Sequence, residues 1–188
     1  MTDTLTTNRQ IEGAVKFIGM QKLMGRETVC GSGSTLENTC AIREWLPRVM
    51  ARHDIRWLHD VPCGDRHWIR SVPIEHYSGT DLLDGVDLLG DYNMPDAKLI
   101  LCRDFLVHLT FGDAKRFLDK CARARFLILT HFPDVTENPE LVETHPGWGW
   151  RPLNMCLPPF NLPEPIDVCE EDEGQGKTLS LFKLSPST

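Results

Sequence analysis

The chain has 188 residues, of which 41% are hydrophobic and 25% are charged, as is typical of a globular protein with a substantial core. Its formal net charge of −7 argues against binding to a long nucleic-acid duplex, because such binding requires a basic face. No apolar run approaches the ~20 residues that a membrane-spanning helix needs. The N-terminus lacks the pattern of a secretory signal, so we expect a cytoplasmic protein without a membrane partner.

The cysteines and histidines do not follow metal-binding spacings. The seven cysteines are scattered and include no CxxC pair, which argues against a disulfide framework and against a structural zinc site. The seven histidines show neither HxxxH nor HExxH spacing. We therefore expect no metal site, and we interpret most of the cysteines as small buried hydrophobic residues.

Residues 1–54 are predicted to form N-terminal helices separated by a loop. Apolar residues recur at helical spacing over 11–24, and the glycines and hydroxyl residues that follow predict a mobile loop. A second helix is expected from about Thr35 to Arg52, where Pro47 should kink it or start another short helix. Its inward side is predicted to comprise Leu36, Ile42, Trp45, Leu46, Val49 and Met50.

Residues 55–132 alternate between short apolar runs and helical patterns. Strands are predicted at 55–60, 76–81, 97–102 and 126–130, and helical segments at 68–72 and 113–125. The run at 126–130 is apolar on both faces, as expected in the middle of a parallel sheet that helices cover. The alternation predicts an α/β fold with a mostly parallel sheet and helices on both faces.

The remaining residues are predicted to form a loop and a hairpin within the same single domain, 1–188. Residues 133–165 are rich in Pro, Gly, Asn and Trp, and we interpret this long irregular segment as a substrate loop. Segments 166–170 and 178–184 resemble strands joined by an acidic turn. Residues 166–188 are therefore expected to add an antiparallel hairpin to one edge of the sheet.

Charged or titratable residues follow each predicted parallel strand. They are Asp60, Asp81, Arg103 with Asp104, and His131. Ligands of open α/β sheets bind at the carboxyl ends of the strands, and an acid about 20 residues beyond the first turn usually holds a ribose diol. Asp81 fits that position, although it is also suited to capping the following turn. The turn Pro62-Cys63-Gly64 has one glycine, which suits a nucleoside cofactor without phosphates better than a dinucleotide.

Six stretches of residues 31–165 carry a resemblance to a known family. They read GSGSTLENTCAIREWL, DVPCGDRHWI, YSGTDLL, DAKLILCRDFLVHLTFGDA, LILTHFP and WRPLNMCLPPFNLPEP. In this order they resemble a class I S-adenosylmethionine-dependent methyltransferase, from a branch found in bacteria and phages. The pair DxPCGDxxW and CRDxLVHL is the more specific part of the resemblance.

The resemblance implies a Rossmann-like fold and S-adenosyl-L-methionine as the cofactor. Asp60 to Gly64 would wrap the methionine and sulfonium side, and Asp81 would hold the ribose. The chain departs from the family between Asp81 and Lys98, where only 16 residues replace a helix and a third strand, so that Asp87 or Asp91 would take the adenine contact. The implied cofactor residues are Asp60, Pro62, Cys63, Gly64, Trp68, Asp81, Leu82, Asp87, Cys102 and Arg103.

Catalysis would be attack by a nucleophile on the methyl group, with a histidine as the base. His108 follows Asp104 by four residues, so both are predicted to share one helical face. The alternative is that His108 only bonds to a backbone carbonyl, and His131 is the second candidate base.

Two further groups are predicted to contact ligands. Arg151, Asn154 and Trp150 are expected to bind substrate, with Phe160 in an apolar wall, unless this segment is only a rigid cover over the sheet edge. A lid would comprise Arg43 and the hydroxyls of Ser32, Ser34 and Thr35.

The sequence thus favours a methyltransferase acting on a small molecule, sugar or nucleotide. The alternative is a catalytically inactive cofactor-binding or regulatory module with the same ancestry. A nicotinamide-dependent oxidoreductase is disfavoured by the single glycine of the turn.

Overall fold

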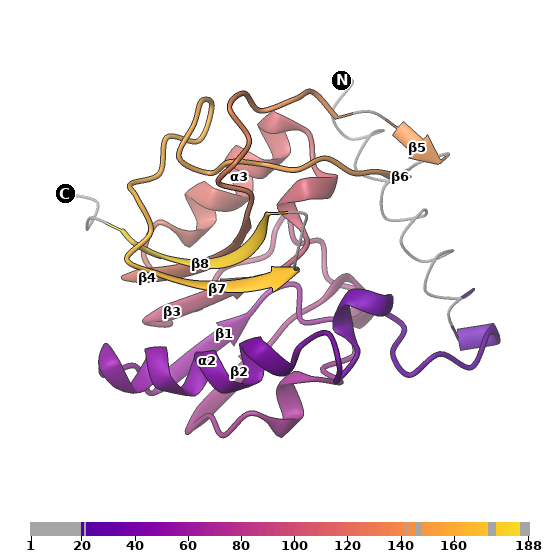
Figure 1. The fold of residues 1–188 in the computed structure, drawn as a ribbon, viewed down its shortest axis with the longest axis vertical. Helices are drawn as coiled ribbons and strands as arrows, with labels where there is room; N and C mark the ends of the chain where they lie inside the picture. The colour runs from indigo at the N-terminus through magenta and orange to yellow at the C-terminus, as the bar shows by residue number, and fades with distance from the viewer. Residues whose placement is uncertain (1–19, 21, 142, 146–147, 173–175, 185–188) are drawn as a thin grey trace.

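A six-stranded mixed sheet forms the centre of the protein (Figure 1). The structure is a computed structural model, and it describes residues 20, 22–141, 143–145, 148–172 and 176–184. The strands are β1 (Trp57–Asp60), β2 (His76–Gly79), β3 (Leu99–Cys102), β4 (Phe126–His131), β7 (Asp167–Asp172) and β8 (Lys177–Lys183). Their order is β2-β1-β3-β4-β8-β7, in which the first four are parallel and the last two are antiparallel to their neighbours.

The predicted fold class is confirmed, including the C-terminal antiparallel hairpin and the shortened third-strand region. The sheet ends at β2, and between Gly79 and Leu99 the chain forms only the short 3-10 helix η3 (Leu82–Asp84) and irregular backbone. Leu88, from this shortened region, is fully buried in the hydrophobic core. A short irregular segment therefore packs where the family resemblance implies a helix and a third strand.

The two faces of the sheet are covered by different helices. Helix α2 (Cys40–Arg52) passes in front of β1 and β2 in Figure 1, and α3 (Phe111–Cys121) lies above the sheet. In β3, Leu99 and Leu101 belong to the core under α2, whereas Ile100 and Cys102 belong to the core under α3. In β4, as in β3, successive apolar side chains alternate between these two cores, and all of them are buried. Both strands are therefore apolar on both faces.

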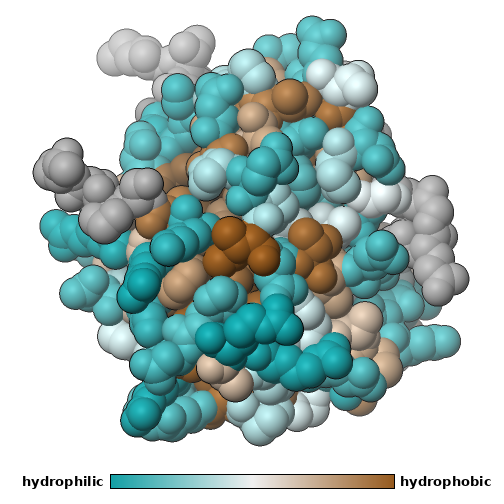
Figure 2. All heavy atoms as spheres, turned by 60° about the vertical axis from the view of Figure 1, so that its left-hand side comes forward, coloured by the Kyte–Doolittle hydropathy of each residue, from teal (hydrophilic) through white to brown (hydrophobic). Residues whose placement is uncertain are grey.

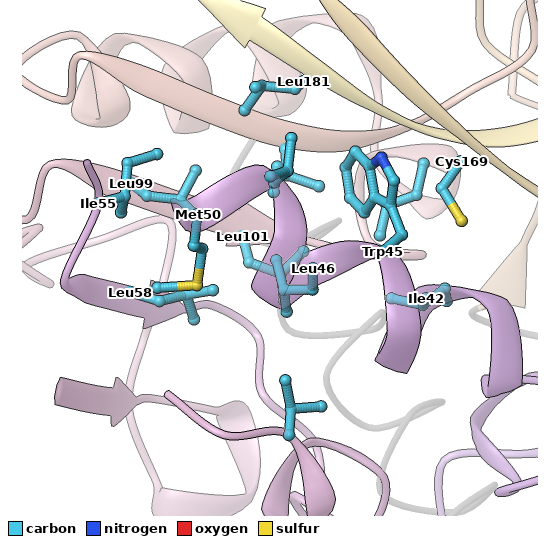
Figure 3. Close-up of a cluster of buried hydrophobic side chains, with 14 of the residues drawn as sticks. Ile42, Trp45, Leu46, Met50, Ile55, Leu58, Leu99, Leu101, Cys169 and Leu181 are labelled. Carbon is cyan, nitrogen blue, oxygen red and sulfur yellow. The ribbon is translucent and has the colours of Figure 1, made fainter. Parts of the chain in front are cut away.

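The core under α2 interlocks the helix with three parallel strands (Figure 3). The side chains of Leu46 and Met50 point from α2 towards Leu58, Leu99 and Leu101 of the sheet. Burying each such leucine or methionine contributes about 1.5–3 kcal/mol, so this interface fixes the sheet relative to α2.

Helix α2 differs from the sequence prediction at its start and at its proline. It begins at Cys40, because Thr35 holds a local turn in which its hydroxyl accepts the Asn38 N–H and its carbonyl accepts the Thr39 hydroxyl. Leu36 is therefore 39% exposed, and its predicted inward placement is wrong. Pro47 lies within one continuous helix, so of the two predicted alternatives the second short helix does not form. Burial of the helix face offsets the lost backbone donor.

Other predictions fall close to the observed elements. The predicted helix at 11–24 lies mostly outside the described residues. The segment expected to be helical at 68–72 is the 3-10 helix η2 (Ile69–Ser71). Within 133–165 the structure adds a small antiparallel pair, β5 (Glu143–His145) and β6 (Trp148–Gly149), that the sequence pattern did not predict.

The parallel strands end at one edge of the sheet, on the right in Figure 1. Asp60, the last residue of β1, pairs with Gly79 of β2 and Leu101 of β3, so these three strand ends are level. Figure 2 turns the opposite side forward, where hydrophobic side chains are interspersed among hydrophilic ones. Among the described residues, no helix is long and apolar enough to cross a bilayer.

Candidate functional site

The carboxyl edge of the sheet gathers most of the predicted site residues. Asp60 ends β1, Asp81 follows β2, and Arg103 and Asp104 follow β3. The charges of Asp81 and Arg103 act on Asp60, as expected for side chains that share one site. His131 ends β4 but is directed into the core, as described below.

Asp60 is a buried carboxyl whose titration is shifted to neutral pH. It is 3% exposed, and its Oδ2 accepts the hydroxyl of Tyr77 at 3.0 Å. Burial raises the pKa of Asp60 to about 7, against the opposing effect of the Tyr77 hydrogen bond. Near pH 7 this carboxyl is therefore divided between its neutral and charged forms.

The turn after β1 approaches another segment so closely that it needs a glycine. Gly64 has φ +56°, in the left-handed region, and a Cβ atom there would lie 2.3 Å from the Sγ of Cys30. The turn contains a cis peptide bond between Val61 and Pro62, and the Cys63 N–H donates to the Thr80 carbonyl at 3.1 Å. The turn is thus joined to the end of β2.

Asp81 caps η3 and also holds the turn. Its Oδ1 accepts the Leu83 N–H at 2.9 Å, and the Asp81 N–H donates to Asp84 Oδ2 at 3.1 Å, which completes a capping box. Its Oδ2 accepts the Gly64 N–H at 2.7 Å. Burial raises the pKa of Asp81, and the two bonds from backbone N–H groups oppose that shift. The capping alternative is therefore realised, at the same point where a ribose contact is predicted.

Residues 28–34, here called the covering segment, lie over the strand ends. The hydroxyl of Thr28 and the N–H of Val29 donate to Asp65 Oδ2 at 2.9 and 3.0 Å. Arg103 Nη2 donates to the Gly33 carbonyl at 2.8 Å. Through these bonds the covering segment is held to the turn after β1 and to the end of β3.

The residues predicted to form a lid fall into two groups. Ser34 Oγ lies 3.4 Å from Arg103 Nη1, at the site. The Thr35 hydroxyl instead bonds locally and donates to the Ser32 carbonyl at 3.0 Å. Arg43 donates to the Leu36 carbonyl at 2.8 Å, so in this structure it stabilises the start of α2.

A buried charge network that the sequence analysis missed surrounds Arg103. Its Nε donates to Glu171 Oε1 at 2.6 Å, and these side chains are 7% and 2% exposed. Lys177 Nζ lies 2.8 Å from Asp104 Oδ2 and 3.5 Å from Glu171 Oε2. Burial alone would raise the pKa of Asp104, but the charges of Arg103 and Lys177 lower it below the ordinary value. Trp68 lies against the same network, with its ring centroid 5.9 Å from the Arg103 guanidinium carbon.

His108 lies beside this network but not on a shared helical face with Asp104. Asp104 has φ +53°, and His108 ends the 3-10 helix η4 (Leu106–His108), so the predicted i, i+4 relationship is wrong. Their charges nevertheless interact. Burial lowers the pKa of His108, and the positive charges of Arg151 and Lys177 act in the same direction, while Asp104 and the bond to Gly149 oppose them.

The tautomer of His108 follows from its hydrogen bond. Its Nδ1 is 2.7 Å from the Gly149 carbonyl, which only accepts, so Nδ1 carries the hydrogen. In the neutral ring the lone pair is then on Nε2. The alternative of a histidine bonded to a backbone carbonyl is therefore observed.

His131 has the opposite arrangement. Its Nδ1 accepts the Met155 N–H at 3.0 Å, and its ring packs edge-on against Phe182 at 5.7 Å between centroids. It is 3% exposed, and burial lowers its pKa to about 4. The geometry gives His131 a role in fixing residues 153–155 to the end of β4.

The three predicted substrate residues differ in their surroundings. Asn154 is used by the loop, since Nδ2 donates to the carbonyls of Pro133 and Val135 at 3.1 and 2.9 Å. Trp150 is 42% exposed and packs edge-on against Phe132 at 5.7 Å. Arg151 is 2% exposed and lies 4.6 Å from the centroid of the Phe111 ring. In the same loop, Phe160 packs edge-on against Phe111, at 5.9 Å between ring centroids.

The remaining predicted residues lie at the margins of the site. Cys102 is buried in the core under α3, and Leu82 is half-buried within η3. Asp87 is exposed, and its Oδ1 accepts the N–H groups of Leu89 and Gly90 at 3.1 and 2.9 Å. Among the described residues, no group of three His, Cys, Asp or Glu side chains is arranged to hold a metal ion.

The strand order and the level strand ends define a Rossmann-like fold. No family model matches the chain, and no curated protein matches it in sequence. Among solved structures it is similar to the Burkholderia thailandensis 1,6-didemethyltoxoflavin-N1-methyltransferase, determined with bound 1,6-didemethyltoxoflavin and S-adenosylhomocysteine. The TM-score is 0.64 at 12% identity, over 98% of this chain and 90% of that chain, so the likeness concerns the fold.

Proposed function

We propose that this protein is an S-adenosyl-L-methionine-dependent methyltransferase that acts on a small molecule, sugar or nucleotide. The observation that carries the proposal is the bond between Asp81 and Gly64, which joins an acid after β2 to the turn after β1. The bacterial enzyme of similar fold, which binds S-adenosylhomocysteine, supports the choice of cofactor.

The residues at the strand ends suit this cofactor in type and placement. Each carboxylate oxygen of Asp81 accepts one backbone N–H and retains a lone pair, with which it would accept a ribose hydroxyl. Asp60 to Gly64, together with Arg103 and Trp68, would enclose the methionine end, and the ionised form of Asp60 would favour a sulfonium. Leu82 and Asp87 would contact the adenine.

When bound, the cofactor would supply an electrophilic methyl group. A lone pair of the acceptor would bond to the methyl carbon, and the electron pair of the broken carbon–sulfur bond would stay on sulfur. The chain would orient the acceptor and exclude water. His108 would take the proton that the acceptor oxygen or nitrogen releases. His131 is the second candidate, and its bond from the Met155 N–H directs it into the core. Asp104, kept ionised by Arg103 and Lys177, would stabilise the resulting imidazolium.

The direct test is calorimetric titration with S-adenosylmethionine, S-adenosylhomocysteine and NAD, followed by assays of S-adenosylhomocysteine release with a panel of acceptors. We expect both sulfur compounds to bind and NAD not to bind. Absence of binding by both sulfur compounds would refute the proposal.

A second candidate is a catalytically inactive cofactor-binding module. One observation favours it: between Gly79 and Leu99 the chain forms only η3 and irregular backbone, in place of the helix and third strand expected of the family. In that case S-adenosylhomocysteine binds, but no acceptor in the panel is methylated. His108→Gln then changes neither the affinity for S-adenosylhomocysteine nor its rate of release in the assays.

A further inference from the structure

Arg151 is a buried cation whose hydrogen-bonding capacity is unused. The residue is 2% exposed, and Nε, Nη1 and Nη2 have no hydrogen-bond partner among the described parts of the chain. A guanidinium offers five N–H donors, and burying a charge without partners is costly. Arg103, whose side chain is 7% exposed, shows the usual solution, with bonds to Glu171 and to the Gly33 carbonyl.

The position of Arg151 is well defined even though its donors are unpaired. Its backbone N–H donates to the Val107 carbonyl at 3.1 Å, which fixes the main chain against η4. The Phe111 ring stacks on the guanidinium at 4.6 Å, so the donors on the guanidinium edge are held in a fixed plane. This is the preorganised fork that recognises carboxylates and phosphates.

The nearby charges do not compensate Arg151. Glu140 is the carboxylate whose charge acts favourably on it, but Glu140 is exposed and forms no hydrogen bond with it within the described residues. Asp113 at the start of α3 is already engaged, with its carboxylate accepting from Thr110 and Arg116. Burial accordingly lowers the pKa of Arg151.

Arg151 adjoins the candidate base. His108 bonds to the Gly149 carbonyl two residues before Arg151, and the Arg151 charge is one cause of the lowered pKa of His108. A group held by Arg151 would therefore lie next to His108. Phe111, whose ring lies against the Arg151 guanidinium, is the first residue of helix α3. The N-terminus of α3 therefore adds a partial positive charge near Arg151.

We propose that Arg151 binds an anionic group of the methyl acceptor, either a carboxylate or a phosphate, and so orients the acceptor's hydroxyl or amine towards His108. The identity of the ligand as the methyl acceptor rests on the proposed function, whereas anion binding at Arg151 does not. The acceptor class is thereby narrowed to acids or phosphate esters that carry a nucleophilic oxygen or nitrogen.

Binding of simple probes tests the site without knowledge of the natural acceptor. Benzoate, phenyl phosphate and neutral benzamide are titrated at constant ionic strength into the full chain, into Arg151→Met, and into Arg48→Met, which removes an exposed arginine of α2. We expect the wild type and Arg48→Met to bind at least one anion and not benzamide, and Arg151→Met to bind it at least 10-fold more weakly. The preferred anion distinguishes a carboxylate from a phosphate ligand. Equal binding of benzamide, undetectable anion binding, or anion binding that survives Arg151→Met overturns the proposal.

Stability provides an independent readout. Because the substitution removes an unpaired buried charge, Arg151→Met should raise the melting temperature, whereas loss of a purely structural arginine would lower it. A lower melting temperature, or failure of the variant to fold, therefore counts against the proposal. Arg151→Lys, which keeps the charge without the fork, should bind anions with intermediate affinity.

Binding of S-adenosylhomocysteine separates the two proposals. If the wild type does not bind it, the methyltransferase proposal fails while the anion site stands. If it binds normally to Arg151→Met and to the wild type but no anion binds, only the anion site fails.

Discussion

The carboxylate of Asp81 accepts the backbone N–H of Gly64 at 2.7 Å, which ties the residue after β2 to the turn after β1. The same carboxylate caps η3 through the Leu83 N–H. One side chain therefore determines the shape of the turn, the start of the shortened third-strand region and the acceptor groups available to a ligand. Loss of Asp81 should affect stability and ligand binding together.

Replacing Asp81 should weaken cofactor binding. Asp81→Ala removes a charged acceptor, so we expect the affinity for S-adenosylhomocysteine to fall by about 1.5–3 kcal/mol, or roughly 10- to 150-fold. Asp81→Asn keeps one acceptor oxygen and should lose less affinity. Calorimetry measures the dissociation constants, with Asp119→Asn on the exposed side of α3 as the matched control. An unchanged constant in Asp81→Ala would rule out the ribose contact.

Asp60 should make the protein less stable as the pH rises towards neutrality. Its folded pKa is about 7 and its ordinary value is 3.8, so between these values the unfolded chain loses a proton that the folded chain retains. The free energy of unfolding should therefore decrease from about pH 4 to pH 7 and then level off with respect to this group. Asp60→Asn, which can still accept from Tyr77, should be more stable than the wild type at pH 8 and equal to it near pH 4.

The comparison of Asp60→Asn with the wild type isolates Asp60 from other groups that titrate. Asp104, whose pKa is lowered, contributes in the opposite direction, because its stabilising effect is lost at acidic pH. Melting temperatures of both proteins from pH 4 to pH 8 give the difference curve. A constant difference across this range would show that Asp60 is ionised throughout.

The two candidate histidines should differ in tautomer. His108 donates from Nδ1 to Gly149, whereas His131 accepts at Nδ1 from Met155, so neutral His108 carries its hydrogen on Nδ1 and His131 on Nε2. Nitrogen chemical shifts of the two rings at pH 7 distinguish these forms, with His108→Gln and His131→Gln supplying the assignments. Identical tautomers would remove the physical reason for preferring His108 as the base.

The same difference predicts the effects on activity. His108→Gln should reduce turnover by about 10²–10⁴-fold, the usual contribution of a general base, without changing the affinity for S-adenosylhomocysteine. His131→Gln should mainly lower stability, since it removes the acceptor for the Met155 N–H.

The sheet could be read from the sequence because its strands are short, strongly apolar and separated by helical patterns. The run 126–130 corresponds to β4, and its burial on both faces matches the prediction. Local hydrogen bonds between side chains and the backbone are harder to predict from the sequence. The hydroxyl of Thr35 delays the start of α2 to Cys40, a competition between side chain and backbone that apolar spacing does not report.

The site could be predicted only where it depends on single strand ends. Asp60, Asp81 and Arg103 can be identified from the sequence because each ends or directly follows a predicted strand. Glu171 and Lys177 were not, because they reach the site from β7 and β8, 68 and 73 residues away from their partners. One local signal was present: a lysine directly after an acidic turn next to a strand. The pairing of Asp104 with His108 failed for a different reason, since a left-handed residue replaced the expected helix.

The Arg103–Glu171 pair should contribute strongly to stability, unlike the exposed pairs on the surface. Removing one partner of a buried ion pair leaves the other charge uncompensated, at a cost of about 3–5 kcal/mol. We expect Arg103→Met and Glu171→Gln each to show such a loss in denaturant unfolding, and the double variant to be less destabilised than the sum of the two. The pair Arg56–Asp54 is the matched control, since its side chains are 71% and 84% exposed and its atoms are 3.8 Å apart. Replacing either of its members should cost less than about 1 kcal/mol.

Because Arg103 also holds the Gly33 carbonyl, Arg103→Met should in addition speed hydrogen exchange in the covering segment, an effect that Glu171→Gln should reproduce only weakly. Additive losses in the cycle, or equal exchange rates in both single variants, would mean that Arg103 does not connect the hairpin to the covering segment.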